Sequence, residues 1–295
     1  MPLESIDRLM RGCREEEYAL GYFESWNLES LQGVLDAAEA TRSPAILGFN
    51  GDFLARGTRL AAERLALYGA IGKAAAESSR VPCALIFNEC PNDRWTLDAV
   101  RAGFNLVMPS DPHASYGEYV RRVQRIVRHC HPRHVAVEAE LGELPCGESG
   151  RVERGGELTD PFLAEQFVRE TGVDLLAVSV GNVHVRIGGE QDLDLDRLAA
   201  VRDHVSVPLV LHGGTGITAR SLREAIRLGV AKVNYGTYLK QRYLSAIRAA
   251  LAHETGNPHE MLGLGGQSDV MVAGRLAVRD AVLERIETLG CCGRA

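Results

Sequence analysis

The chain has 295 residues, of which 45% are hydrophobic and 24% charged, a balance that suits a globular protein with a sizeable core. Its formal net charge of -6, without a cluster of Lys and Arg interleaved with aromatics, excludes nucleic acid as an expected partner. No apolar run approaches the roughly 18 to 20 residues of a membrane span, and the N-terminus lacks an apolar segment behind a basic start. Seven irregularly spaced cysteines do not suggest a disulfide framework, so we expect a cytoplasmic protein without a membrane partner.

Short apolar runs with strand-like composition recur along the chain. They cover residues 18–23, 44–50, 83–88, 106–110, 134–141, 175–180, 208–213 and 232–236. Each is nearly continuously hydrophobic, as expected for a strand buried on both faces. Stretches with helical periodicity separate them, including residues 27–40, 116–130 and 218–229.

Eight such strand and helix units predict an α/β fold, the (β/α)8 TIM barrel. A doubly wound open sheet is the alternative, but the GxGxxG turn after its first strand is absent. No Pro, Gly or Ser linker divides the chain. We therefore predict one domain over residues 1–295, with residues 277–295 packing outside the closed ring as a C-terminal helical extension.

Polar residues end most of the predicted strands, where a barrel places its functional groups. They are Asn50, Asn88, Glu89, Ser110, Asp111, Glu140, His184, His212 and Asn234. Neighbouring sixth and seventh strands would bring His184 and His212 to one ion, and Glu89 would face them across the barrel mouth. Two histidines and one carboxylate suit zinc, or alternatively manganese or iron. The competing interpretation is that these histidines are hydrogen-bonded structural residues.

The sequence HGGTG at residues 212–216 suggests a second function. Gly213, Gly214 and Thr215 would let backbone N–H groups approach an anion, and a predicted helix follows at once. We therefore expect a phosphate group here, although glycine runs also make simple tight turns. Thr237, after the eighth strand, would either add a hydroxyl to this site or cap its own helix.

Several segments together resemble the class II, metal-dependent fructose-bisphosphate and tagatose-bisphosphate aldolase family. They are VEAELG, TGVDLLAV, GNVH, VPLVLHGGTG, AKVN and the tail ERIETLGCCGRA, and the resemblance extends over essentially the whole chain. It implies a (β/α)8 fold, one divalent ion and reversible aldol cleavage of a ketose phosphate. His184 and His212 fall where the family keeps two zinc ligands. Its phosphate and substrate loops match Gly213, Thr215, Asn234 and Thr237. We further expect a homo-oligomer, either a dimer or a tetramer.

The chain also departs from that family. The family's third strand ends in a pattern like HLDHG, whose Asp is the acid/base and whose second His is the third metal ligand. Here the same positions hold Asn88, which cannot exchange a proton, and Glu89, which can still bind a metal. Asn50 replaces a Ser that follows the second strand in the family. Arg186 comes shortly after the sixth-strand His; it either binds a phosphate or carboxylate group of the substrate or lies in solvent. These changes predict a substrate other than fructose 1,6-bisphosphate.

Either Glu148 or a metal-bound water could supply the missing proton chemistry. Glu148 aligns roughly with an acidic loop residue of the family that takes part in proton exchange, or it is a solvated loop residue. Glu140 either helps to orient the site or is a buried, hydrogen-bonded carboxylate. The sequence thus predicts a metal-dependent lyase acting on a small-molecule sugar phosphate or a related keto acid. The alternative is a non-catalytic descendant that binds a sugar phosphate or serves in an assembly.

Overall fold

The structure is a computed structural model that describes residues 3–142, 156–183, 189–252 and 256–295. Within these residues, parallel strands form a closed barrel in the order β1 to β8, so the (β/α)8 fold predicted from the sequence is confirmed. The strands are β1 Leu20–Ser25, β2 Ala45–Asn50, β3 Cys83–Cys90, β4 Leu106–Pro109, β5 Ala136–Leu141, β6 Leu175–Val178, β7 Leu209–Leu211 and β8 Val230–Tyr235.

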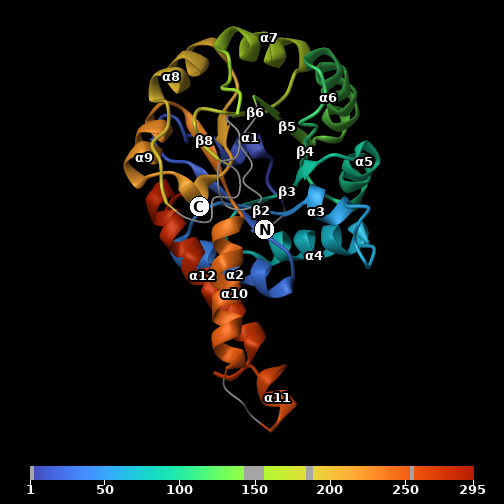
Figure 1. Cartoon of the computed structure of the whole chain (residues 1–295), viewed down its shortest axis with the longest axis vertical. Helices are drawn as coiled ribbons and strands as arrows, with labels where there is room; N and C mark the ends of the chain where they lie inside the picture. The colour runs from blue at the N-terminus through green and yellow to red at the C-terminus, as the bar shows by residue number, and fades with distance from the viewer. Residues whose placement is uncertain (1–2, 143–155, 184–188, 253–255) are drawn as a thin grey trace.

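Helices surround the barrel in the described part of the chain (Figure 1). They are α1 Ile6–Leu9, α2 Leu28–Thr41, α3 Gly51–Ala55, α4 Leu65–Ser78, α5 Asp93–Ala102, α6 Tyr116–Cys130, α7 Pro161–Thr171, α8 Leu195–His204, α9 Ala219–Arg227, α10 Thr237–Leu251, α11 Pro258–Met261 and α12 Val270–Leu289. Two 3-10 turns, η1 His131–Arg133 and η2 Gly214–Gly216, join them. Side-chain caps begin many of these helices; Asn27, for example, accepts a hydrogen bond from the Ser30 backbone N–H at 2.9 Å at the start of α2.

Strand register decides which side chains enter the barrel. Because successive side chains of a strand point to opposite faces, the pairs Asn50 with Asn88, Val210 with Lys232, and Tyr22 with Asn234 lie on common faces. The ammonium group of Lys232 lies 5.3 Å from the centre of the Tyr22 ring, which places both side chains inside the barrel. The interior is thus polar toward the carboxyl ends of the strands, where a site is expected.

The C-terminal helices lie outside the ring of strands (Figure 1). Helix α10 leads away from the barrel toward α11, and α12 runs back along α10 and α2 (Figure 1). Arg275 of α12 binds Asp36 of α2 through its Nε and Nη2 atoms at 2.6 and 2.7 Å. This bidentate contact and the apolar face of α12 fix the extension against the barrel's helical layer.

Candidate active site

Strand β3 is irregular at the residues that begin the site. The β3–β4 register shifts between Phe87 and Cys90, and Glu89 has a φ of 53°. A left-handed backbone is costly for a residue with a side chain, and such strain persists where surrounding contacts hold it. Asn50 provides one of these contacts, because its Nδ2 donates to Glu89 Oε2 at 2.9 Å. This backbone directs the Glu89 carboxylate toward the barrel mouth.

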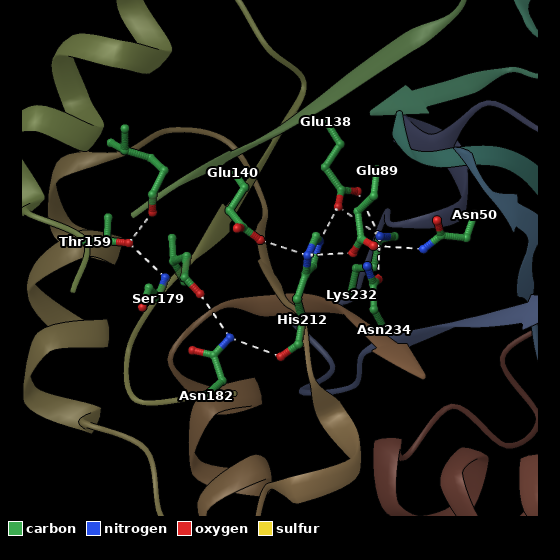
Figure 2. Close-up of polar contacts among 12 residues, drawn as sticks. Asn50, Glu89, Glu138, Glu140, Thr159, Ser179, Asn182, His212, Lys232 and Asn234 are labelled. Atoms are coloured by element: carbon green, nitrogen blue, oxygen red, sulfur yellow. Dashed lines mark hydrogen bonds and ion pairs between the residues drawn. The ribbon is translucent and has the colours of Figure 1, made fainter. Parts of the chain in front are cut away.

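His212 occupies the centre of the site (Figure 2). It follows β7, and only 1% of its side chain is exposed. Its Nδ1 lies 2.8 Å from Glu140 Oε2 and 3.2 Å from Glu89 Oε1, while its Nε2 lies 3.1 Å from Glu138 Oε1. Asn182 Nδ2 donates to the backbone carbonyl of His212 at 3.0 Å and fixes the chain there. Three carboxylates from two strands therefore surround one imidazole.

This environment controls the charge of the imidazole. Burial disfavours the imidazolium, but Glu140, helped by Glu138 and Glu89, outweighs burial and raises the pKa of His212 well above its ordinary value. Burial likewise opposes the charge of Glu138, yet Lys232 and His212 outweigh it and lower the pKa of Glu138. Glu138 is therefore an ionised acceptor, and the His212 Nε2 donates to it.

Lys232 and Asn234 extend the cluster along β8. Both the Lys232 and Glu138 side chains are completely buried. Lys232 Nζ lies 2.8 and 3.0 Å from the two Glu138 oxygens, and it donates to Asn234 Oδ1 at 2.6 Å. The sequence interpretation missed Glu138 and Lys232. Their signal was a charged residue within an otherwise apolar run, at a position whose parity faces the barrel interior.

The donor atoms around His212 Nδ1 have the right chemistry for a divalent ion. Imidazole nitrogen and carboxylate oxygen are both zinc ligands, and Glu89 and Glu140 direct oxygens at the same ring nitrogen. No group of three or more His, Cys, Asp or Glu side chains within the described residues is already spaced to hold a metal. The residues fit a metal by donor type, and their present spacing is that of ion pairs around His212.

The glycine turn after β7 leads into the helix expected from the sequence. The 3-10 turn Gly214–Gly216 comes first, and Thr218 then caps α9 by accepting from the Ser221 N–H. A Cβ on Gly214 would lie 2.6 Å from Val233 Cγ1, so tight packing on β8 requires this glycine. Gly214 therefore packs closely on β8, and the predicted anion contacts of Gly213, Gly214 and Thr215 stay predictions.

Helix α10 begins without a side-chain cap. Gly236 is its N-cap and Thr237 its first residue, and no side chain caps it. The alternative in which Thr237 caps the helix is therefore wrong. Uncapped N–H groups at the start of a 15-residue helix beside β8 remain suitable for an oxyanion.

Three of the predicted site residues cannot be placed. His184, Arg186 and Glu148 lie outside the described residues. Asn88 is 2% exposed, and its Oδ1 accepts no hydrogen bond within the described part of the chain. It lies in the barrel interior, in register with Asn50.

The chain matches proteins of one known family along its whole length. A family model described as "Fructose-bisphosphate aldolase class-II" matches residues 4–294. The chain belongs to the class II fructose-bisphosphate aldolase family. It is 32% identical over 297 aligned positions to a fructose-bisphosphate aldolase of Geobacillus stearothermophilus, covering 100% of this chain and 99% of that protein.

Two solved structures resemble this class II family member closely. The YdjI aldolase of Escherichia coli K12 superposes with a TM-score of 0.81 at 31% identity, covering 99% of each chain. A putative fructose-1,6-biphosphate aldolase of Coccidioides immitis gives a TM-score of 0.83 at 28% identity, covering 98% of this chain and 97% of that one. In the described part of this family member, no helix is long and apolar enough to cross a lipid bilayer.

Proposed function

We propose that the protein is a metal-dependent lyase that reversibly cleaves a phosphorylated or acidic keto-sugar by aldol chemistry. The observation that carries this proposal is the convergence of Glu89 and Glu140 on His212 Nδ1, at 3.2 and 2.8 Å. Family membership supports the reaction class, and class II aldolases as a family depend on a divalent metal. Zinc is the proposed ion, with manganese and iron as alternatives.

The roles of His212, Glu89, Glu138 and Glu140 are proposed from their positions in the fold, and those of His184 and Glu148 from the family resemblance alone. His212 and Glu89, together with His184, are the proposed ligands, and the Glu140 carboxylate lies close enough to join them. Bound there, the ion would polarise the ketose carbonyl. Glu138 holds the imidazole by accepting from Nε2, so that Nδ1 faces the barrel mouth. Glu148 is the proposed acid/base of the reaction.

The phosphate of the substrate is proposed to bind between the turns after β7 and β8. Gly213, Gly214 and Thr215 would offer backbone N–H groups, and the uncapped start of α10 would add its own N–H groups and the Thr237 hydroxyl. Arg186 and Asn234 would contact the rest of the substrate.

Asn88 favours a second candidate, a sugar-phosphate-binding protein without catalysis or a subunit of an assembly. Its amide occupies the position where the family keeps its acid/base Asp, and an amide cannot exchange a proton. The two candidates share the binding site and differ in turnover. We propose that either form is a cytoplasmic homo-oligomer, a dimer or a tetramer.

Metal analysis tests the proposal directly. Protein purified without chelator is expected to contain one divalent ion per chain by mass spectrometry. Mutating a residue that only supports a metal ligand typically lowers metal affinity roughly 10- to 100-fold, and His212→Ala, which removes a proposed ligand, should lower it further. His204→Ala is the matched control, because His204 pairs with Glu165 at 3.1 Å on the surface. Full occupancy in a folded His212→Ala variant would overturn the site.

Turnover distinguishes the two candidates. Dihydroxyacetone phosphate, the smallest ketose phosphate, is incubated with a panel of neutral and acidic aldehydes, and condensation products are sought by mass spectrometry. A product that requires both His212 and metal supports the lyase. Binding of dihydroxyacetone phosphate without any product across the panel supports the non-catalytic protein.

A further inference from the structure

Glu138, Lys232 and Asn234 form a buried polar cluster inside the barrel. Metal binding by the proposed ligands does not explain why these three side chains are there. Lys232 is one of only three lysines in a chain with 33 Lys and Arg residues. It is fully buried, and so is its partner Glu138. Burying an ion pair is costly and frequently gives no net stability, so a specific role in orienting its neighbours is a reasonable hypothesis to test.

Nucleophilic chemistry does not account for Lys232. An ammonium group has three N–H donors and no acceptor. It donates to Glu138 Oε1 at 3.0 Å and to Asn234 Oδ1 at 2.6 Å, and it forms an ion pair with Glu138 Oε2 at 2.8 Å. An ammonium group held in these contacts has no lone pair to attack a carbonyl. Lys232 therefore acts by donating hydrogen bonds to the side chains beside it.

The contact with Asn234 determines which way that carboxamide faces. An ammonium can only donate, so the Asn234 atom that touches it must be the carbonyl oxygen, and the amino group Nδ2 must point away. Asn234 is 93% buried, since 7% of it is exposed, and Nδ2 has no hydrogen-bond partner within the described residues. A buried N–H without a partner is unfavourable, and a ligand oxygen would relieve that cost.

We propose that Lys232, anchored by Glu138, is a positioning residue that fixes the Asn234 carboxamide with Nδ2 facing the ligand as a hydrogen-bond donor. Asn234 then recognises an oxygen acceptor of the substrate, such as a carbonyl, hydroxyl or oxyanion. The ketose-phosphate ligand used below rests on the proposed function. Glu138 Oε1 also accepts from His212 Nε2 at 3.1 Å, so one buried carboxylate connects the imidazole and the carboxamide (Figure 2).

The first experiment measures the orientation without any ligand. The side-chain amide signals of Asn234 are recorded by 15N nuclear magnetic resonance and assigned by their loss in Asn234→Leu. They are expected to move in Lys232→Met, which removes the ammonium at similar volume. Lys240→Met is the matched control, because that lysine pairs instead with Glu24 and lies over the Phe53 ring at 4.2 Å. Unchanged Asn234 signals in Lys232→Met would overturn the proposal.

The second experiment measures the consequence for binding by calorimetry with dihydroxyacetone phosphate. Asn234→Leu and Lys232→Met are each expected to weaken binding about tenfold, the effect of one good hydrogen bond. The double variant should be at most about threefold weaker than either single variant, because both remove the same interaction. A fully additive loss of about a hundredfold would mean that the two residues act independently, and would overturn the proposal.

Two outcomes need separate treatment. Should Lys232→Met not fold, Lys232→Met with Glu138→Gln removes both buried charges together and is measured in its place. Should the native protein not bind dihydroxyacetone phosphate, the proposed ketose-phosphate function falls. The resonance experiment on the ligand-free protein then still decides whether Lys232 positions Asn234.

Discussion

Asn88 and Glu89 show how two adjacent side chains can alter the chemistry of an inherited site. The left-handed backbone at Glu89 turns its carboxylate toward His212, while Asn88 stays inside the barrel in register with Asn50. An amide at residue 88 keeps a donor and an acceptor but cannot carry a proton between substrate and solvent. Substrate recognition can therefore persist where proton transfer has been lost or moved.

We expect the native protein to cleave fructose 1,6-bisphosphate slowly for this reason. General acid/base assistance is typically worth about 10² to 10⁴ in rate, and Asn88 cannot supply it. The measurement is a coupled assay of triose phosphate release with zinc-loaded protein. Asn88→Asp alone should not restore efficient cleavage, because Glu89 and Asn50 also differ from the family pattern. Efficient turnover of fructose 1,6-bisphosphate by the unmodified protein would contradict the inference that Asn88 leaves the site without its usual acid/base.

At the scale of an element, Asp269 shows how a single carboxylate organises a helix start. It is 2% exposed and caps α12, accepting from the backbone N–H groups of Gly263, Gly265, Met271 and Val272 at 2.8 to 3.4 Å. The N–H of Gly265, and less strongly the others, lowers the pKa of Asp269 against the opposing effect of burial. This cap joins the α11 turn to the helix that packs along the barrel.

Asp269→Ala is expected to lower the free energy of unfolding by about 1 to 2 kcal/mol at neutral pH, as loss of an N-cap does. The folded pKa lies below the unfolded value of about 3.9, so the ionised form stabilises the fold above that pH. The difference between native and variant protein should therefore shrink as pH falls below about 4. Urea unfolding of both proteins at pH 7 and at stepwise lower pH measures this difference in the free energy of unfolding.

Asp160→Ala is the matched control for this cap. Asp160 is an exposed N-cap of α7 and accepts from one backbone N–H, that of Leu163, at 2.9 Å. Asp160→Ala should lower the free energy of unfolding by less than Asp269→Ala does at pH 7. An Asp269→Ala effect that stays constant down to the acid transition would refute the role of the ionised carboxylate.

The strands and their contacts show which features could be predicted from the sequence and which could not. Strands buried on both faces are nearly uniform in hydrophobicity, so their order and the closed barrel were predictable. The turn at Glu89 was not, because its φ is set by contacts with Asn50 and His212 from other strands. Glu138 and Lys232 appeared as isolated charges within apolar runs, and only the register between strands makes them partners. The site could be located at the barrel mouth, but its hydrogen bonds required the fold.

At the scale of the whole molecule, the C-terminal helices give the protein its elongated outline. Helix α10 carries the chain away from the barrel to α11 at the far end (Figure 1). Large exposed apolar side chains occur along this segment, namely Leu244, Leu251, Leu262, Leu264 and Leu276. Leucines gathered on a projecting segment favour burial against another protein surface. A second copy of the chain is the partner that the homo-oligomer proposal supplies.

We therefore expect the protein to self-associate through this projecting segment. Leu262 is 56% exposed and Leu264 66%. Replacing both with Ser should weaken association on the order of a hundredfold, because burying each leucine contributes about 1.5 kcal/mol or more. Light scattering coupled to size-exclusion chromatography measures the mass of the particle across a concentration series.

Leu60→Ser is the matched control, since Leu60 is fully exposed but precedes α4 on the barrel's own periphery. Its particle mass should equal that of the native protein. An oligomer that survives Leu262→Ser with Leu264→Ser and dissociates in Leu60→Ser would place the interface on the barrel wall. A native protein that is monomeric at all concentrations would contradict the self-association prediction, and it would leave the metal prediction for the polar cluster around His212 untouched.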